Sequence, residues 1–281
     1  MTELVTTNGK SIAQLAQELG ATMGQTNGGN NASRMSELKI NSSPDDDAGN
    51  PTPRGHFFIK GEDTPAFAPD VTLRVLTHHF QYLNYDNVVK KLVSKSKIIQ
   101  HFGEEPIDTA GTIRCGKPKS SELAQMAPEQ REKYSGVTCF RQVRGLVSFE
   151  GKTALGEKVL YENKPVILML KGTNFQPFHE EFLTKLPKGR NIWDFQAKLT
   201  TKRHKNGSVV WYTFHFEPDL HNPVGLDQDT VDSIGAIADF IKSENNGITK
   251  AHNAALASQT MDQRALNAIE GELDNDFVDA A

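Results

Sequence analysis

The chain has 281 residues, of which 37% are hydrophobic and 23% are charged, enough to build a hydrophobic core. The longest apolar run, residues 166–170, is far shorter than the roughly 20 residues of a membrane span, and the first residues lack the basic-then-apolar pattern of a secretory signal. The two cysteines, Cys115 and Cys139, exclude a disulfide framework and a four-thiolate zinc site. We therefore expect a soluble protein of a reducing compartment that uses neither a metal nor a cofactor.

Charge is distributed unevenly along the chain, although the net charge is only −4. Residues 54–225 hold 25 Lys and Arg against 18 Asp and Glu, a net charge of +7. Residues 1–53 and 226–281 are acidic, with net charges of −3 and −8. Because a basic body attracts polyanions such as nucleic acids, the charge pattern gives the first indication of function.

The first 53 residues are expected to contribute little to the folded body. Ser11 can cap a short helix that Gly20 ends, but an isolated helix of this length is marginal in water. Residues 21–53 are rich in Asn, Gly, Ser and Pro, and such a segment buries too little apolar surface to offset its ordering entropy. We interpret residues 1–53 as a short helix followed by a disordered linker.

The folded domain is predicted to span residues 54–225 and to be mainly β. Alternating apolar and polar residues predict its strands, and a stripe of Phe178, Phe182 and Leu186 predicts a helix. In chain order, the expected elements are strands at residues 55–60, 71–83, 137–150, 158–163 and 165–171, a helix at 175–186, and strands at 191–205 and 208–217.

Other segments have weaker or different signals. Residues 87–100 are compatible with a strand or a short helix, whereas the composition of residues 121–134 favours a helix interrupted at Pro128. Asp229 can cap a helix in the last part of the chain. We interpret residues 226–281 as this helical segment followed by an acidic, flexible tail.

The clearest local signal is Asn206-Gly207, a dipeptide typical of a two-residue hairpin turn. With these residues in the turn, Lys205 is opposite Ser208, and apolar residues line one face of the ribbon. The other face is basic and carries one indole, while Arg203 and Lys205 flank the turn. The residues of this second face are Lys198, Lys202, His204, Trp211 and His215.

A row of lysines beside a tryptophan is typical of a surface that binds single-stranded nucleic acid. Ammonium groups neutralise phosphates and release counterions, and the indole stacks on unpaired bases. The alternative is that Trp211 only covers the aliphatic stems of the lysines on a solvated sheet face.

The order of the elements favours the nucleic-acid interpretation. Three strands, a helix and the hairpin follow the β-β-β-α-β-β order of an oligonucleotide-binding (OB) barrel, a Greek-key fold that holds nucleic acid on its strand 2–3 face and nearby loops. The expected fold is therefore mainly β with peripheral α-helices, an OB-fold-like Greek-key barrel with flexible termini.

A basic barrel-like body followed by an acidic tail with a late aromatic residue resembles the replicative single-stranded-DNA-binding proteins of bacteria and tailed bacteriophages. The resemblance covers architecture and tail character, without a diagnostic motif in the body. It implies that the tail competes for the DNA groove and docks replication proteins, which assigns this role to Asp274, Asp276, Phe277 and Asp279. Two alanines follow Asp279, whereas many such tails end on the acidic-aromatic motif. The two cysteines do not match the His and three Cys of zinc-containing members.

Two further patterns bear on the chemistry. Glu150-Gly-Lys152 has the Glu-x-Lys spacing of metal-dependent nucleases, but no suitable aspartate stands on the preceding segment. Basic residues elsewhere offer additional phosphate contacts. These secondary candidates are Arg141 and Arg144 on a predicted strand and Lys117 and Lys119 in a loop.

The sequence thus predicts a non-enzymatic protein of the bacterial or infected-host cytoplasm that binds single-stranded DNA without sequence preference, in replication, recombination or repair. The alternatives are a structural or adaptor protein of a virion and a metal-dependent nuclease. Homo-oligomer formation is left open, and no membrane contact is expected. The predicted contacts with DNA are Lys198, Lys202, Arg203, Lys205, Trp211 and His215, with Arg141, Arg144, Lys117 and Lys119 as secondary candidates.

Overall fold

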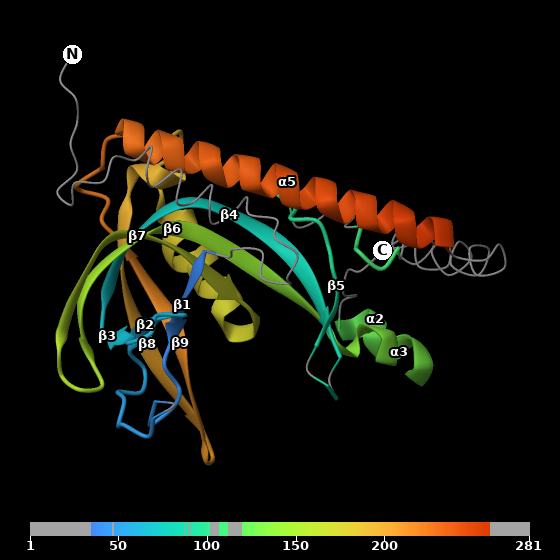
Figure 1. The fold of residues 1–281 in the computed structure, drawn as a ribbon, viewed down its shortest axis with the longest axis horizontal. Coiled ribbons are helices and arrows are strands. Elements are labelled where there is room, and N and C mark those ends of the chain that lie inside the picture. Colours follow the sequence, from blue (N-terminus) through green and yellow to red (C-terminus); the bar gives the residue numbers. More distant parts are fainter. Residues whose placement is uncertain are drawn as a thin grey trace. The chain divides into compact units, whose positions relative to one another are not determined.

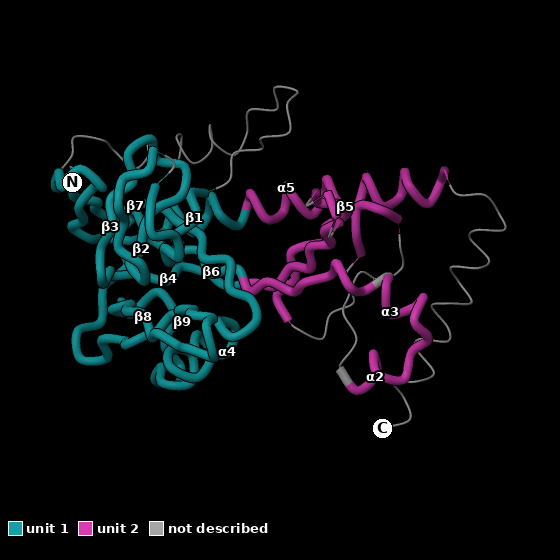
Figure 2. Tube along the Cα trace, turned by 90° about the horizontal axis from the view of Figure 1, so that it is seen from below, with its two compact units in different colours: residues 1–78, 142–238 teal, residues 79–141, 239–281 magenta. Residues whose placement is uncertain are grey.

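The computed structural model describes residues 35–46, 48–86, 88–89, 91–101, 107–111 and 120–258. The helix expected at residues 11–20, the loop candidates Lys117 and Lys119, and the tail candidates Asp274, Asp276, Phe277 and Asp279 lie outside these residues. Two compact units make up the chain, shown in teal and magenta in Figure 2. Unit 1 consists of residues 1–78 and 142–238, and unit 2 of residues 79–141 and 239–281.

The chain is mainly β, as predicted, and its mixed sheet curls into a half-barrel compatible with an OB-like barrel (Figure 1). The strands follow the order β2-β1-β7-β6-β4-β8-β9, while β3 pairs with β6 and β5 pairs with β4. Their bounds are β1 (Ser36–Ile40), β2 (Phe57–Lys60), β3 (Ala66–Phe67), β4 (Val71–Tyr85), β5 (Leu92–Lys95), β6 (Val137–Thr153), β7 (Lys158–Leu170), β8 (Gln196–Asn206) and β9 (Val209–Pro218).

The predicted run of three strands between residue 137 and the helix is wrong, because residues 158–163 and 165–171 belong to one strand, β7. Only β6 and β7 precede the helical segment there, and β5 and two short helices within residues 120–135 separate β6 from β4. At the expected break, Asn163 has a positive φ of 47°, and its backbone N–H donates to Ser148 Oγ at 2.8 Å. This local bond to β6 lets β7 continue through an irregular residue.

Strand β1 lies within the segment that was expected to be a linker, so that expectation is wrong for residues 36–40. This strand pairs antiparallel with β2 and parallel with β7, and it buries Leu38. Its partners come from distant parts of the chain. Pairing to two strands supplies the backbone hydrogen bonds and apolar contacts that the local sequence lacks.

The core of unit 1 lies between the curled sheet and a helical segment at residues 172–185. This segment is a succession of short helical pieces: η1 (Gly172–Asn174), α4 (Phe175–Pro177), η2 (Phe178–Phe182) and η3 (Leu183–Lys185). Phe178 and Phe182 are fully buried, and the Phe178 ring packs edge-on against Phe216 of β9. The predicted apolar stripe is therefore confirmed at these two phenylalanines, and it fixes the helical segment against β9.

A buried arginine holds the chain after β9 against β4. Arg74, only 5% exposed, donates from Nε to the Trp193 carbonyl at 3.0 Å, from Nη1 to Thr230 Oγ1 at 2.9 Å and from Nη2 to the Gly225 carbonyl at 2.8 Å. Burial lowers the pKa of this guanidinium, an effect that the charges of Asp227 and Asp194 oppose. Arg74 is thus a structural residue of unit 1.

The last described helix, α5 (Gln228–Ser258), runs through both units and is longer than expected. Its first turn is capped by Asp227, whose Oδ1 accepts from the Thr230 backbone N–H at 2.7 Å, so the predicted cap at Asp229 is wrong by two residues. None of the helices among the described residues is long and apolar enough to cross a membrane.

Unit 2 contains the second part of β4, β5, the start of β6, two short helices and most of α5. The helices α2 (Ser120–Gln125) and α3 (Pro128–Ser135) confirm the predicted helical segment interrupted at Pro128. Inside the unit, the Asn245 side chain of α5 pairs with both backbone groups of Ile98, at 2.7 and 2.9 Å. Burial raises the pKa of the Cys139 thiol on β6 to about 11, against a smaller opposite effect of a hydrogen bond with Tyr82.

Candidate nucleic-acid interface

The β8–β9 hairpin exists, but its turn is shifted by one residue from the prediction. Asn206 pairs with Val209, so Gly207 and Ser208 are the two turn residues. Gly207 has a φ of +58° and Ser208 does not have a positive φ, as in a type II′ turn with glycine in its first central position. Lys205 is consequently opposite Val210 instead of Ser208. Each residue of β8 is thus paired with the β9 residue two positions beyond its predicted partner. Because side chains alternate between the two faces of a strand, every side chain keeps its predicted face.

The apolar face of the hairpin belongs to the core of unit 1. Ala197, Leu199 and Phe216 are fully buried, and Phe214 is 7% exposed. The other face carries the predicted residues Lys198, Lys202, His204, Trp211 and His215, and the cross-strand pair His204–Trp211 lies within it. The division of the hairpin into a core face and a polar face is confirmed.

Trp211 is half-buried and stacks on His204. Their ring centroids are 5.3 Å apart and their planes differ by 15°. A hydrogen bond of 2.8 Å between His204 Nε2 and the hydroxyl of Thr213, which is itself buried, holds the imidazole in place. The two rings form a flat, ordered aromatic pair, the kind of surface on which an unpaired base stacks.

A pocket of about 270 Å³ lies beside this aromatic pair. One wall is the polar face of the hairpin and the other is the helical segment 172–185. Its lining residues are Thr173, Gln176, Pro177, Glu180, Glu181, Lys202, His204, Trp211, Thr213 and Phe214. Sequence reasoning missed the residues of the second wall, because only the packing of Phe178 and Phe182 brings that segment to the hairpin.

Glu181 is the charged centre of this region. Its Oε1 accepts from Lys202 Nζ at 2.8 Å, and its Oε2 accepts from His215 Nδ1 at 2.9 Å and from the Phe216 backbone N–H at 3.0 Å. Partial burial on its own would raise the pKa of Glu181, but these three hydrogen bonds outweigh it, so the pKa lies below its usual value. The sequence signal for Glu181 was its position at the border of the buried Phe178–Phe182 stripe.

The helical segment also covers the outer edge of β9, the last strand of the sheet order. Phe214 and Phe216 point their backbone N–H groups away from β8. The Phe214 N–H donates to Asn174 Oδ1 at 2.9 Å, and the Phe216 N–H donates to Glu181. Two side chains thus take the place of a neighbouring strand along this part of the edge.

The predicted cationic row is only partly free. Lys198 lies 3.6 Å from Asp70, and Lys202 and His215 both contact Glu181. Arg203 and Lys205 lie on the opposite face of the hairpin, beyond the core, and are exposed. Neither of these two has an ion pair with a described residue. The free positive charge of the hairpin therefore sits at its tip instead of in a row beside Trp211.

The tip also carries a second aromatic residue. Tyr212, opposite Arg203, packs against the backbone of Gly55, where a Cβ atom would lie 2.6 Å from Tyr212 Cε1. Gly55 has a φ of +81°, so this position needs glycine both for its conformation and for the close approach of the ring.

Arg141 and Arg144, which were predicted as secondary phosphate contacts, are both buried. Arg144 is 2% exposed and donates from Nη2 to Gln142 Oε1 at 2.6 Å. Arg141, in unit 2, is 7% exposed and lies over the Phe80 ring, with its guanidinium carbon 5.2 Å from the ring centroid. Neither side chain presents its charge to solvent, because strand β6 is buried along much of its length.

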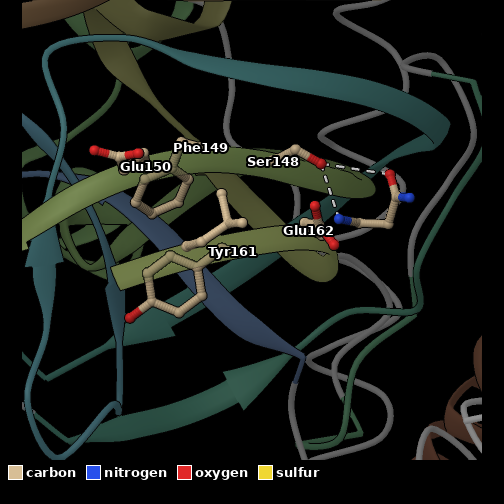
Figure 3. Close-up of a pocket in the computed structure, with 7 residues that line it drawn as sticks. Ser148, Phe149, Glu150, Tyr161 and Glu162 are labelled. Atoms are coloured by element: carbon tan, nitrogen blue, oxygen red, sulfur yellow. Dashed lines mark hydrogen bonds between the residues drawn. The ribbon is translucent and has the colours of Figure 1, made fainter. Parts of the chain in front are cut away.

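A second pocket, of about 370 Å³, lies on strands β6 and β7 (Figure 3). Its lining includes two carboxylates, Glu150 and Glu162, and the hydrogen-bonded pair Ser148 and Asn163. Glu150 is exposed and forms an ion pair of 2.8 Å with Lys158, which lowers the pKa of its carboxyl group. Within the described residues, no group of three His, Cys, Asp or Glu side chains is arranged to hold a metal ion. This acidic surface does not suit a polyanion, so we place the candidate interface on the hairpin.

Comparison with known proteins gives no match: no family model, curated protein sequence or solved structure matches the chain.

Proposed function

We propose that the chain binds single-stranded DNA without sequence preference, in replication, recombination or repair, through the β8–β9 hairpin. In this proposal Trp211 stacks on a base, and Arg203 and Lys205 contact phosphates at the tip of the hairpin. A replicative single-stranded-DNA-binding protein of a phage or bacterium is the class that these features suit best.

The observation that carries the proposal is the stacked pair of Trp211 and His204 beside a pocket of about 270 Å³. A base that stacks on Trp211 leaves its sugar-phosphate backbone near Lys202 on the same face, and the DNA reaches Arg203 and Lys205 by passing around the tip to the other face. Stacking is insensitive to sequence because every base has a π face.

Fold and charge support the same function. With β5, α2 and α3 taken as an insertion between β4 and β6, the remaining order β4-β6-β7-helix-β8-β9 is that of OB barrels, in which the loops next to the sheet hold oligonucleotides. Residues 54–225 carry a net charge of +7, and the free cations at the hairpin tip add to an attraction for phosphate that weakens as salt rises.

A salt titration of binding to a fluorescein-labelled oligo-dT tests the proposal. We expect the logarithm of the association constant to fall linearly with the logarithm of the salt concentration, by about 0.7 for each phosphate neutralised. A duplex of the same length is the control, and binding to it should be weaker because its bases are already stacked. Absence of binding to oligo-dT at low salt would overturn the proposal.

A protein partner for the hairpin is the second candidate function. The observation that favours it is the contact of Asp70 with Lys198 and of Glu181 with Lys202 and His215, which leaves the Trp211 face mixed in charge. A structural or adaptor role would bury this mixed face against protein, and it predicts no binding to the oligonucleotide in the salt titration.

A further inference from the structure

We propose that Lys202 and His215 form a phosphate subsite that Glu181 occupies in the free protein and that a DNA phosphate takes over on binding. This inference rests on the proposed function and deepens it. In this inference, Glu181 competes with a DNA phosphate for Lys202 and His215.

The donors around Glu181 are those expected of an anion site. An ammonium group, an imidazole and a backbone N–H converge on one carboxylate, at 2.8, 2.9 and 3.0 Å. Charge-assisted hydrogen bonds of this kind hold phosphate oxygens as well as carboxylate oxygens. Glu181 lines the same pocket as Trp211, so the subsite lies within the proposed interface.

The position of the ion pair allows exchange. The side chain of Lys202 is 51% exposed and that of His215 is 31% exposed, whereas Glu181 is 20% exposed. Solvent therefore reaches the side chains of Lys202 and His215, and the exposed ion pair of Lys202 with Glu181 is weak enough for another anion to replace the carboxylate. When single-stranded DNA stacks a base on Trp211, its neighbouring phosphate is held close to Lys202, so the local concentration of phosphate at the subsite is high.

Glu180 provides a matched control on the neighbouring residue. It lines the same pocket and is exposed, but its side chain has no hydrogen bond or ion pair with a described residue. Glu180→Gln and Glu181→Gln change the net charge by the same amount. A difference between them therefore reports the contacts of Glu181 and not the general attraction of a less acidic protein.

The experiment compares oligo-dT binding by the full-length wild type, Glu181→Gln and Glu180→Gln across a range of salt concentrations. Glutamine at 181 keeps an oxygen for the Phe216 N–H, so the edge of β9 stays capped. We expect Glu181→Gln to bind more tightly than Glu180→Gln at low salt, because no carboxylate then has to be displaced from Lys202. Equal affinities of the two variants would overturn the inference.

A second variant tests the subsite without changing Glu181. If Lys202 meets a phosphate in the complex, Lys202→Gln lowers the wild-type slope by about 0.7; an unchanged slope means that Lys202 stays with Glu181 and overturns the inference. In either case, steep salt-dependent binding by the wild type leaves the proposed function standing. Failure of the wild type to bind oligo-dT overturns both proposals.

Discussion

Trp211 and His204 face each other across the β8–β9 hairpin, and their rings stack at 5.3 Å with nearly parallel planes. The imidazole therefore supports one face of the indole, as a second base would in a stack. An aromatic surface that is already ordered loses little conformational entropy when a ligand stacks on it.

Trp211→Ala should weaken binding to oligo-dT by about 1–3 kcal/mol. The side chain is half-buried on the polar face, so the fold should survive its removal. Fluorescence anisotropy with a labelled oligonucleotide measures the change, and circular dichroism checks the fold. Trp211→Phe keeps an aromatic ring, so it should lose less affinity for oligo-dT than Trp211→Ala. Unchanged affinity in folded Trp211→Ala would remove Trp211 from the site.

Arg203→Gln and Lys205→Gln should each lower the slope of the salt dependence by about 0.7, because each removes one free cation from the hairpin tip. Lys198→Gln is the internal comparison. Lys198 already lies 3.6 Å from Asp70, so its loss should have a smaller effect. If the three substitutions change the slope equally, the tip has no special role and general surface charge explains the binding.

Deletion of residues 270–281 should tighten binding to oligo-dT at low salt. This segment contains five acidic residues and no basic residue, so its removal takes away a competitor for the cationic surface. A full-length variant with these acidic residues changed to Asn and Gln separates charge from length. If neither protein binds better than the wild type, the competition model for the tail is wrong.

Phe182→Ala should destabilise unit 1 by about 3–5 kcal/mol, because it leaves a cavity under the helical segment. The Phe182 ring is fully buried and stacks on Phe178 with 5.5 Å between centroids. Urea unfolding followed by circular dichroism gives the free energy of unfolding. Val209→Ala, at a position that is 62% exposed, should change it by less than about 0.5 kcal/mol.

Cys139 should react slowly with iodoacetamide near neutral pH. Its pKa of about 11 means that the reactive thiolate forms only in strongly basic solution. Because an unfolded thiol ionises at lower pH, this residue's contribution to stability is present below pH 9 and is lost as pH rises towards 11. Mass spectrometry of a Cys115→Ser variant follows Cys139 alone. Alkylation as fast as in urea would contradict the raised pKa of this half-buried thiol.

The faces of the hairpin were predictable because they depend only on the alternation of side chains along a strand. The turn was not, since Asn206-Gly207 and Gly207-Ser208 are both acceptable two-residue turns. Asn206 stays in the strand because Gly207 alone supplies the positive φ that the turn needs.

Features that depend on contacts between residues far apart in the chain could not be predicted from the sequence. Strand β1 is specified by pairing with β2 and β7, and the burial of Arg144 depends on what covers β6. The contact between Glu181 and Lys202 depends on the path of the helical segment. Its turns change from one helical type to another, so the usual 3.6-residue period does not give the direction of Glu181.

The caps that Asn174 and Glu181 place on β9 bear on how the molecule behaves in crowded solution. A bare terminal strand invites strands of other molecules to add to it, which leads to aggregation. With the Phe214 and Phe216 amides already engaged, this stretch of the sheet offers no template for such growth. Under the proposed function, many copies bound to one DNA molecule would not join their sheets through this segment.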